Sequence, residues 1–363
     1  MPAYLRVCLL VAASFATVAA AQDPVTQQPV APQIPPPQTH TPQAPDPHSI
    51  HIDVAVNSTS GKPATGLSQQ DFTLLDNKAA QPVGSFKSIL LGQEPAEVIL
   101  LIDGVNTPYT TVAYEMGELQ RFLKANPKLP HPTTIAVLKD KGAEIQKGFS
   151  TDGTLLSKLL DGYSPGLRIL GRTTGFWGAT ERLDISLTAA RELTTYAATL
   201  PGRKILIWIS PGWPLLSGPR IEMDGNEQKK LFNDVVDFST ALRQARVTLY
   251  NINPHGVGEP LLRADYYQEF TKGVRRPKDT QIGNLGLQVL AVQSGGLAIE
   301  SSNDIADSLQ KCMAETESWY EISFPIPPAE SPNEYHHLEV KLNKAGLSAR
   351  TRDGYYAQPE ARP

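Results

Sequence analysis

The middle of the chain contains the run Val98-Ile99-Leu100-Leu101-Ile102, which leads directly into Asp103-Gly104-Val105-Asn106-Thr107. A strand that is apolar at every position is expected where both of its faces are covered, as in a parallel sheet with helices on either side. The polar residues that follow then mark the carboxyl end of that strand. In open α/β sheets, ligands bind at this edge.

Similar apolar runs recur toward the C-terminus, and helical patterns separate them. Further strands are predicted over residues 134–139, 144–149, 205–209, 247–252 and 297–300. Helices are predicted over residues 112–123, 151–160, 183–200, 231–242, 285–292 and from 303 onward. This alternation predicts an α/β domain over residues 93–318, with a doubly wound, mostly parallel sheet and helices on both of its faces.

Two segments of different character flank this domain. In residues 48–92, Ile50, Ile52 and Val54 recur with the period of two that is typical of a half-buried strand. Residues 319–358 contain further predicted strands separated by turns. Neither segment is large enough to bury its apolar face alone, so we expect the two to pair into one β-sandwich into which the α/β domain is inserted.

The N-terminal residues carry targeting and linker signals. Residues 1–21 predict a signal peptide, because Arg6 precedes an apolar stretch that ends in Ala19-Ala20-Ala21. An anchor that is retained in the membrane is the alternative. Residues 22–47 contain nine prolines and six glutamines in 26 residues, which predicts a disordered tether, and residues 359–363 form a short tail. We therefore expect an exported protein, either secreted or periplasmic.

Charge and cysteine usage exclude several classes of protein. The chain has 33 Lys and Arg against 37 Asp and Glu, a net charge of -4, and no basic run that would bind nucleic acid. No stretch beyond residue 21 approaches the roughly 18 apolar residues that a membrane span needs. Cys8 lies in the predicted signal peptide, so Cys312 would be the single cysteine left and no internal disulfide is expected.

No catalytic constellation is recognisable in the sequence. No serine stands in a Gly-x-Ser-x-Gly context, and Cys312 has no evident base. His336 and His337 are neighbours on a predicted strand, so their side chains point to opposite faces, and both are expected at the surface. We therefore predict a non-enzymatic protein, with a secreted hydrolase whose site is unrecognised as the alternative.

The run from Leu101 to Pro108 resembles the first loop of the von Willebrand factor A family, and more narrowly its acidobacterial secreted branch. The resemblance extends to residues 65–72, Gly202-Arg203-Lys204 and Trp319-Tyr320. It implies a Rossmann-like α/β domain that binds proteins or matrix through the loops at the carboxyl edge of its sheet.

The same resemblance implies a metal-ion-dependent adhesion site that is degenerate. Asp103, Thr107 and Thr180 match its oxygen donors, whereas Val105 and Pro211 stand where two further donors would be, and neither side chain coordinates a cation. We therefore expect no cofactor, and a Mg²⁺ site remains the alternative if Asn106 or Asp184 substitutes. Asp103 and Thr107 would otherwise satisfy neighbouring backbone groups.

Aromatic residues are expected on the loops at this same edge. Trp177 and Trp213 are candidates for contact with a partner, because large amphipathic rings dominate interface energetics, and packing of the loops against each other is the alternative. The predicted ligand-binding rim comprises Asp103, Asn106, Thr107, Trp177, Thr180 and Trp213. Its partner would be an unknown protein, envelope component or matrix; a structural envelope protein without a ligand face is the remaining alternative.

Overall fold

The computed structural model describes residues 49–161, 175–214, 223–255, 266–300, 302 and 304–359. The predicted signal peptide, the tether and most of the predicted tail lie outside these residues. Among the described helices, none is both long enough and apolar enough to cross a membrane.

The largest sheet has seven strands in the order β11-β10-β9-β5-β6-β7, with β8 paired to β6. Its strands are β5 (Ala96–Asp103), β6 (Lys128–Lys139), β7 (Gly142–Ile145), β8 (Ser150–Asp152), β9 (Arg203–Ile209), β10 (Val247–Ile252) and β11 (Ala298–Ile299). All the pairings within β11-β10-β9-β5-β6 are parallel, and only β7 and β8 pair with β6 in the antiparallel sense. The predicted mostly parallel α/β sheet is therefore confirmed.

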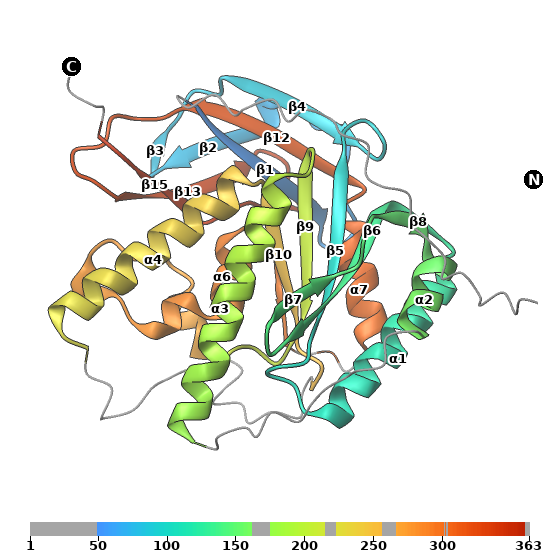
Figure 1. Cartoon of the computed structure of the whole chain (residues 1–363). Helices are drawn as coiled ribbons and strands as arrows, with labels where there is room; N and C mark the ends of the chain where they lie inside the picture. The colour runs from blue at the N-terminus through green and yellow to red at the C-terminus, as the bar shows by residue number, and fades with distance from the viewer. Residues whose placement is uncertain are drawn as a thin grey trace, which may run out of the picture. The chain divides into compact units, whose positions relative to one another are not determined.

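Helices cover both faces of this sheet (Figure 1). They are α1 (Tyr109–Ala125), α2 (Gly153–Asp161), α3 (Phe176–Ala198), α4 (Gly225–Gln244), α6 (Leu287–Gln293) and α7 (Ile305–Ala314). Helices α1, α2 and α7 share one buried cluster with the sheet, and α3, α4 and α6 share another. Because every residue of β5 is buried, its continuous apolar run has the environment expected of a strand covered on both faces.

The two ends of the chain form two antiparallel four-stranded sheets, in the orders β14-β1-β12-β4 and β15-β13-β2-β3. The strands from the N-terminal side are β1 (Ser49–Ser58), β2 (Phe72–Asp76), β3 (Ala79–Ala80) and β4 (Ser85–Leu90). Those from the C-terminal side are β12 (Ser318–Pro325), β13 (Glu334–Leu342), β14 (Leu347–Arg350) and β15 (Gly354–Ala357). Each sheet pairs strands from both ends, and apolar side chains of both sheets share one buried cluster.

Short 3₁₀ helices complete the described fold. They are η1 (Gln69–Asp71), η3 (Tyr266–Phe270), η4 (Pro277–Asp279) and η5 (Ile282–Leu285).

Some element boundaries differ from those that the sequence predicts. Strand β6 begins at Lys128 rather than at residue 134, although Pro130 and Pro132 argue against a strand. These prolines are tolerated because the first part of β6 pairs irregularly with the short strand β8, which the sequence did not predict. Helix α3 begins at Phe176 rather than at the predicted residue 183. The sequence pattern did not reveal this start because the first turn is largely exposed and lacks the apolar stripe of the rest of the helix.

The expectation that both adjacent histidines lie at the surface is wrong for His336. Its ring is 6% exposed, its Nδ1 lies 2.9 Å from Asp76 Oδ1, and it stacks on Tyr355 with ring centroids 4.9 Å apart. The alternation along β13 turns this ring toward the buried side, where the carboxylate of Asp76 satisfies it. His337 points to the opposite face, and its side chain is 41% exposed.

Candidate functional site

The candidate site lies where strands β5, β9 and β10 end at the carboxyl edge of the parallel sheet. Asp103 is the last residue of β5, and Ser210 directly follows β9. Ser210 Oγ donates to Asp103 Oδ2 at 2.8 Å, and the Asn251 side chain on β10 donates to the Ser210 carbonyl at 2.9 Å. Side-chain hydrogen bonds therefore tie the ends of three neighbouring strands together.

The carboxylate of Asp103 is fully buried and accepts hydrogen bonds on both oxygens. The donors to Oδ1 are the backbone amides of Val105 at 2.9 Å and Asn106 at 2.8 Å. The donors to Oδ2 are Asn106 Nδ2 at 2.9 Å, Trp208 Nε1 at 3.2 Å and Ser210 Oγ at 2.8 Å. A carboxylate offers about four lone-pair sites, so these donors occupy the acceptor capacity that a cation would need.

Thr107 and Glu115 lie beside this network, and neither is exposed to solvent. By standard hydrogen-bond geometry, the Thr107 hydroxyl and both Glu115 carboxyl oxygens have no partner in the described part of the chain, although the Thr107 hydroxyl lies close enough to Glu115 to moderate its pKa. Burial, followed by the negative charge of Asp103, raises the pKa of the Glu115 carboxyl well above its usual range. The neutral acid is therefore strongly favoured at this position.

The sequence does contain a signal for Glu115 that we missed. Its position on α1 lies between Val112 and Leu119, at the three- and four-residue spacing of the buried stripe. Ser210 was also missed, although it follows a continuous apolar strand in the same way as Asp103. A polar residue on an apolar stripe or at the end of a buried strand predicts a buried polar contact.

The structure does not bring Thr180 into the Asp103 network. The Thr180 hydroxyl donates to the Phe176 carbonyl at 3.0 Å within the first turns of α3. Ser186, almost two turns further along α3, is the residue that accepts a hydrogen bond from Asn106 Nδ2, at 2.9 Å. Thr180 therefore stands outside the hydrogen-bond network of Asp103, and its place in the expected donor set with Asp103 and Thr107 stays a prediction. Among the described residues, no group of three or more His, Cys, Asp or Glu side chains is placed to hold a metal ion.

The two positions that lack metal donors have other roles in the structure. Val105 is fully buried and belongs to the cluster under α3 and α4. The Pro211 carbonyl accepts a hydrogen bond from Gln288 Nε2 at 3.3 Å. Both residues therefore hold the loops against the neighbouring helices.

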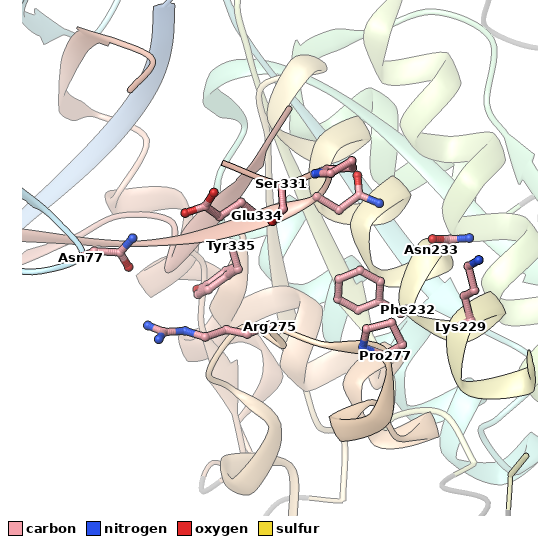
Figure 2. Close-up of a pocket in the computed structure, with 11 residues that line it drawn as sticks. Asn77, Lys229, Phe232, Asn233, Arg275, Pro277, Ser331, Glu334 and Tyr335 are labelled. Atoms are coloured by element: carbon pink, nitrogen blue, oxygen red, sulfur yellow. The ribbon is translucent and has the colours of Figure 1, made fainter. Parts of the chain in front are cut away.

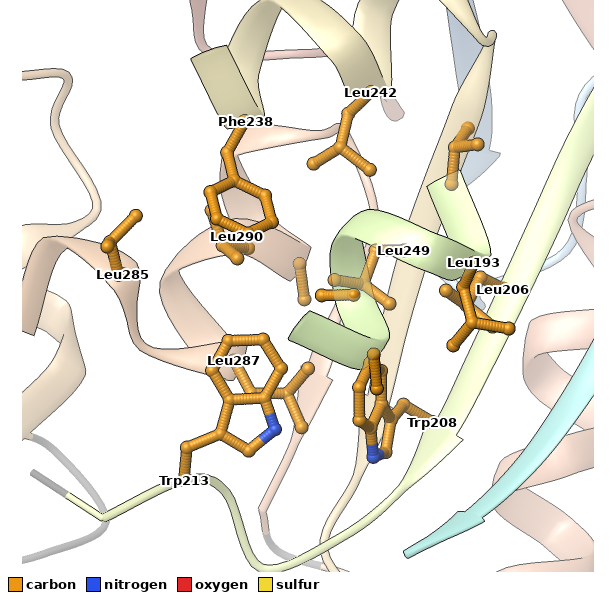
Figure 3. Close-up of a cluster of buried hydrophobic side chains, with 14 of the residues drawn as sticks. Leu193, Leu206, Trp208, Trp213, Phe238, Leu242, Leu249, Leu285, Leu287 and Leu290 are labelled. Atoms are coloured by element: carbon orange, nitrogen blue, oxygen red, sulfur yellow. The ribbon is translucent and has the colours of Figure 1, made fainter. Parts of the chain in front are cut away.

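Trp213 lies in the core rather than on the surface, which corrects its assignment to the ligand-binding rim. The residue is 4% exposed, and its ring packs edge-on against Trp208 with centroids 5.2 Å apart. Figure 3 shows both indoles among leucines from β10, α6 and the segment before α6, including Leu249, Leu287 and Leu285. The chain after β9 folds over the sheet, so its tryptophan fills a gap between helices and does not face solvent.

Trp177, by contrast, is 76% exposed, and its neighbour Phe176 is 51% exposed. The two rings contact each other edge to face, with centroids 5.8 Å apart, at the start of α3. Tyr109, at the start of α1, is 55% exposed. Both helices begin at the edge where the parallel strands end (Figure 1), so we call these three residues the rim aromatics.

No family model matches this sequence, and no curated protein matches it. Three solved structures are similar over much of the chain. The proximal thread matrix protein 1 of the mussel byssus is 13% identical, with a TM-score of 0.37 over 66% of this chain and 51% of its own. The manganese-loaded TRAP protein of Plasmodium vivax is 9% identical, with a TM-score of 0.32 over 78% of this chain and 99% of its own. The human COPII-coat protein Sec24c is 10% identical, with a TM-score of 0.32 over 73% of this chain and 44% of its own.

These similar structures include von Willebrand factor A-domain proteins, and the parallel sheet described above is compatible with that fold. The chain spans about half the length of the mussel protein. At identities and TM-scores this low, the similarity carries no argument about the activity of this chain.

Proposed function

We propose that this chain is an exported von Willebrand factor A-like protein, secreted or periplasmic, that binds a protein or matrix partner and is not an enzyme. Its α/β domain would be inserted into a β-sandwich built from both chain ends. The binding surface would be the rim aromatics at the carboxyl edge of the parallel sheet. The observation that carries this proposal is the exposure of Trp177 beside Phe176.

Exposed aromatic rings at this edge favour protein binding for an energetic reason. An adjacent phenylalanine and tryptophan that both face water leave a large apolar area uncovered, and covering apolar area contributes roughly 25 cal/mol per Å². Tryptophan and tyrosine are also enriched among the residues that dominate binding energy in protein interfaces. A partner that covers Trp177 would therefore gain affinity from a few side chains.

Binding would be independent of divalent metal, in keeping with a degenerate adhesion site. The donors around Asp103 already occupy its oxygens, and the valine at position 105 is buried in the core. A cation would have to displace several hydrogen bonds before it reached this carboxylate. The proposed interaction therefore depends on the rim aromatics and not on a bound ion.

The Phe176→Ala/Trp177→Ala double variant tests the proposed binding surface. The full chain, the double variant and a control Leu91→Ala variant are immobilised and exposed to extracellular and periplasmic fractions of the source organism. Leu91 is 46% exposed in the turn after β4, where it lies outside the rim, so it controls for the general loss of an exposed apolar side chain.

We expect the wild-type and Leu91→Ala proteins to retain the same partner, and the double variant to lose it. We also expect retention to be equal in Mg²⁺ and in EDTA. Equal retention by the double variant would contradict the proposed surface, and loss of binding in EDTA would contradict metal independence.

A thermal melt gives a second test of metal independence. Ligand that binds only the native state raises the melting temperature by mass action. We expect Mg²⁺ and Mn²⁺ at millimolar concentration to leave the melting temperature within about 1 °C of an EDTA control, because ions far below their dissociation constant stabilise negligibly. A rise of several degrees would show that a cation does bind.

A further inference from the structure

A cavity of about 510 Å³ lies between α4, the segment at Arg275 and Pro277, and the turn that precedes β13 (Figure 2). We infer that this cavity binds a small, hydroxyl-rich carboxylate, of which a sugar acid is the simplest example. Its lining residues include neither the Asp103 network nor the rim aromatics, so the inference is independent of the proposed function. The volume falls within the roughly 300–1,000 Å³ that is usual for small-molecule sites.

The floor of the cavity is aromatic and rigid. Phe232 and Tyr335 are 5% and 8% exposed, and both rings pack against Tyr356, with centroids 5.9 and 5.2 Å from it. The Tyr335 hydroxyl donates to Asp353 Oδ2 at 2.5 Å, and the Gly273 amide donates to the same oxygen at 3.2 Å. The floor is therefore fixed before a ligand arrives, which lowers the entropic cost of binding.

Two cations line the walls and make no ion pair within the described part of the chain. Lys229 is on α4 and Arg275 is in the segment before η4, and both are exposed. Glu334 is the acidic residue of the cavity, and its Oε2 already accepts a hydrogen bond from the Glu330 amide at 2.7 Å. The cavity thus has a surplus of positive charge, which favours an anionic ligand; the planar guanidinium of arginine suits a carboxylate in particular.

Three asparagines add groups that suit hydroxyls. Asn77, Asn233 and Asn333 line the cavity together with Ser331. The Oδ1 atoms of Asn77 and Asn333 accept hydrogen bonds from the His337 amide at 3.2 Å and from Gln358 Nε2 at 2.5 Å, which directs both side chains and leaves their amide nitrogens as donors.

Each part of the cavity therefore matches one part of a sugar acid. Arg275 and Lys229 lie at opposite ends of the cavity (Figure 2), so either one matches its carboxylate. The amides and the serine match its hydroxyl groups, and the largely buried rings of Phe232 and Tyr335 form the apolar base beneath it. The combination of all three kinds of contact in one cavity favours the small hydroxylated acid.

Isothermal titration calorimetry on the full chain tests this inference with two matched probes, methyl glucuronide and methyl glucoside. These probes differ only in that a carboxylate replaces a hydroxymethyl group. The Lys229→Gln/Arg275→Gln variant removes both cations of the cavity. The control is Lys230→Gln/Lys278→Gln, which has the same change in charge at two exposed lysines that do not line the cavity.

We expect the wild-type protein to bind the glucuronide at least about tenfold more tightly than the glucoside, because charge-assisted hydrogen bonds to the carboxylate are lost in the neutral probe. The Lys229→Gln/Arg275→Gln variant should lose that preference and the control variant should keep it. The Phe176→Ala/Trp177→Ala protein should also keep it, which separates this site from the proposed rim.

Three results would overturn the inference. The first is the absence of glucuronide binding at millimolar concentration. The second is equal affinity for the two probes. The third is an equal loss of affinity in the cavity variant and in its charge-matched control, which would show that the attraction comes from the overall charge of the surface.

Discussion

The Asp103 carboxylate is buried and is stabilised by hydrogen bonds, and no cation of the described residues forms an ion pair with it. Leaving a charged group without partners in the interior is very costly, so the donors around Asp103 are a requirement of the fold. Two of these donors are Trp208 on β9 and Ser210 directly after it, about a hundred residues away in the sequence. Asp103 therefore ends β5 and also links the end of β5 to the end of β9 through these hydrogen bonds.

The Asp103→Asn substitution tests this role at the scale of one residue. An asparagine presents an amide group where the carboxylate accepts from Trp208 and Ser210, so charge-assisted hydrogen bonds are lost and two donors face each other. We expect the free energy of unfolding to fall by about 3 kcal/mol in urea denaturation. The exposed Asp184→Asn variant should change it by less than about 0.5 kcal/mol. Equal effects of the two substitutions would show that the network contributes little.

Glu115 predicts a pH dependence of stability. Its pKa is raised in the folded state, so the stability that it contributes is fully present below the pKa of the unfolded chain and is lost as pH rises through the raised pKa. We expect Glu115→Gln, which is neutral at every pH, to match the wild type near pH 4 and to become progressively more stable than it at alkaline pH. Parallel melting-temperature profiles of the two proteins across this range would contradict a buried neutral acid.

At the scale of elements, helix starts and strand starts are set by local contacts that a hydrophobic pattern does not reveal. Helix α4 begins six residues before the first residue of its predicted apolar stripe, at a capping box in which Asp224 accepts from the Glu227 amide at 2.9 Å. Strand β9 begins after Gly202, whose φ of 64° is disfavoured for other residues. A Cβ atom at this position would also lie only 1.9 Å from the Pro95 carbonyl oxygen, so glycine is required here.

The cap of α4 gives a prediction at this scale. Asp224→Ala removes the side-chain acceptor for the Asn226 and Glu227 amides. We expect a loss of about 1 kcal/mol in the free energy of unfolding, and most of it should be recovered in Asp224→Ser, which can also cap a helix. If alanine and serine have the same effect, the cap does not contribute to stability.

At the scale of the whole molecule, an ionic network joins the β14-β1-β12-β4 sheet to the parallel sheet. Arg246, just before β10, donates to Asp53 on β1 and to Glu321 on β12, each at 2.7 Å. His51 and then Arg246 lower the pKa of Glu321 to about 2. The pairing of β1 with β12 thus presents two carboxylates to one arginine at the amino edge of the parallel sheet.

Replacing Arg246 with glutamine tests this connection. It removes the closest cation from two largely buried carboxylates, and leaves Asp53 with Arg203 at 3.9 Å and Glu321 with Lys87 at 3.7 Å. We therefore expect the free energy of unfolding at pH 7 to fall by about 2 kcal/mol. The exposed pair of Arg191 and Asp234 serves as the control, and Arg191→Gln should cost no more than about 1 kcal/mol.

The same variant has an expected pH signature. Glu321 has a lowered pKa when folded, so its contribution is present above the pKa of the unfolded chain, near 4.5, and is lost as pH falls toward 2. The deficit of Arg246→Gln should therefore shrink in acid. A deficit that is constant between pH 7 and pH 3 would contradict an electrostatic origin.

More of the fold than of the site could be predicted from the sequence, because the pattern of apolar residues within one segment indicates how that segment is buried. Continuous apolar runs such as Val98–Ile102 predict strands covered on both faces, and alternation such as Ile50, Ile52 and Val54 predicts strands covered on one. The same logic located Asp103 at a strand end. It failed for Trp213, because large aromatic residues occupy exposed edges and core gaps alike and the pattern around them does not distinguish the two.

By itself, then, the sequence determined the alternation of strands and helices, the mostly parallel sheet and the position of Asp103 at its carboxyl edge. The tertiary structure alone decided which groups donate to the oxygens of Asp103, which tryptophan faces solvent, and that α4 and the turn before β13 line a cavity with two cations. The physical reason is the separation along the sequence of the residues that determine each feature. Secondary structure follows from the spacing of neighbouring residues, whereas a hydrogen bond or a cavity depends on atoms brought within a few ångströms by segments that lie a hundred residues apart.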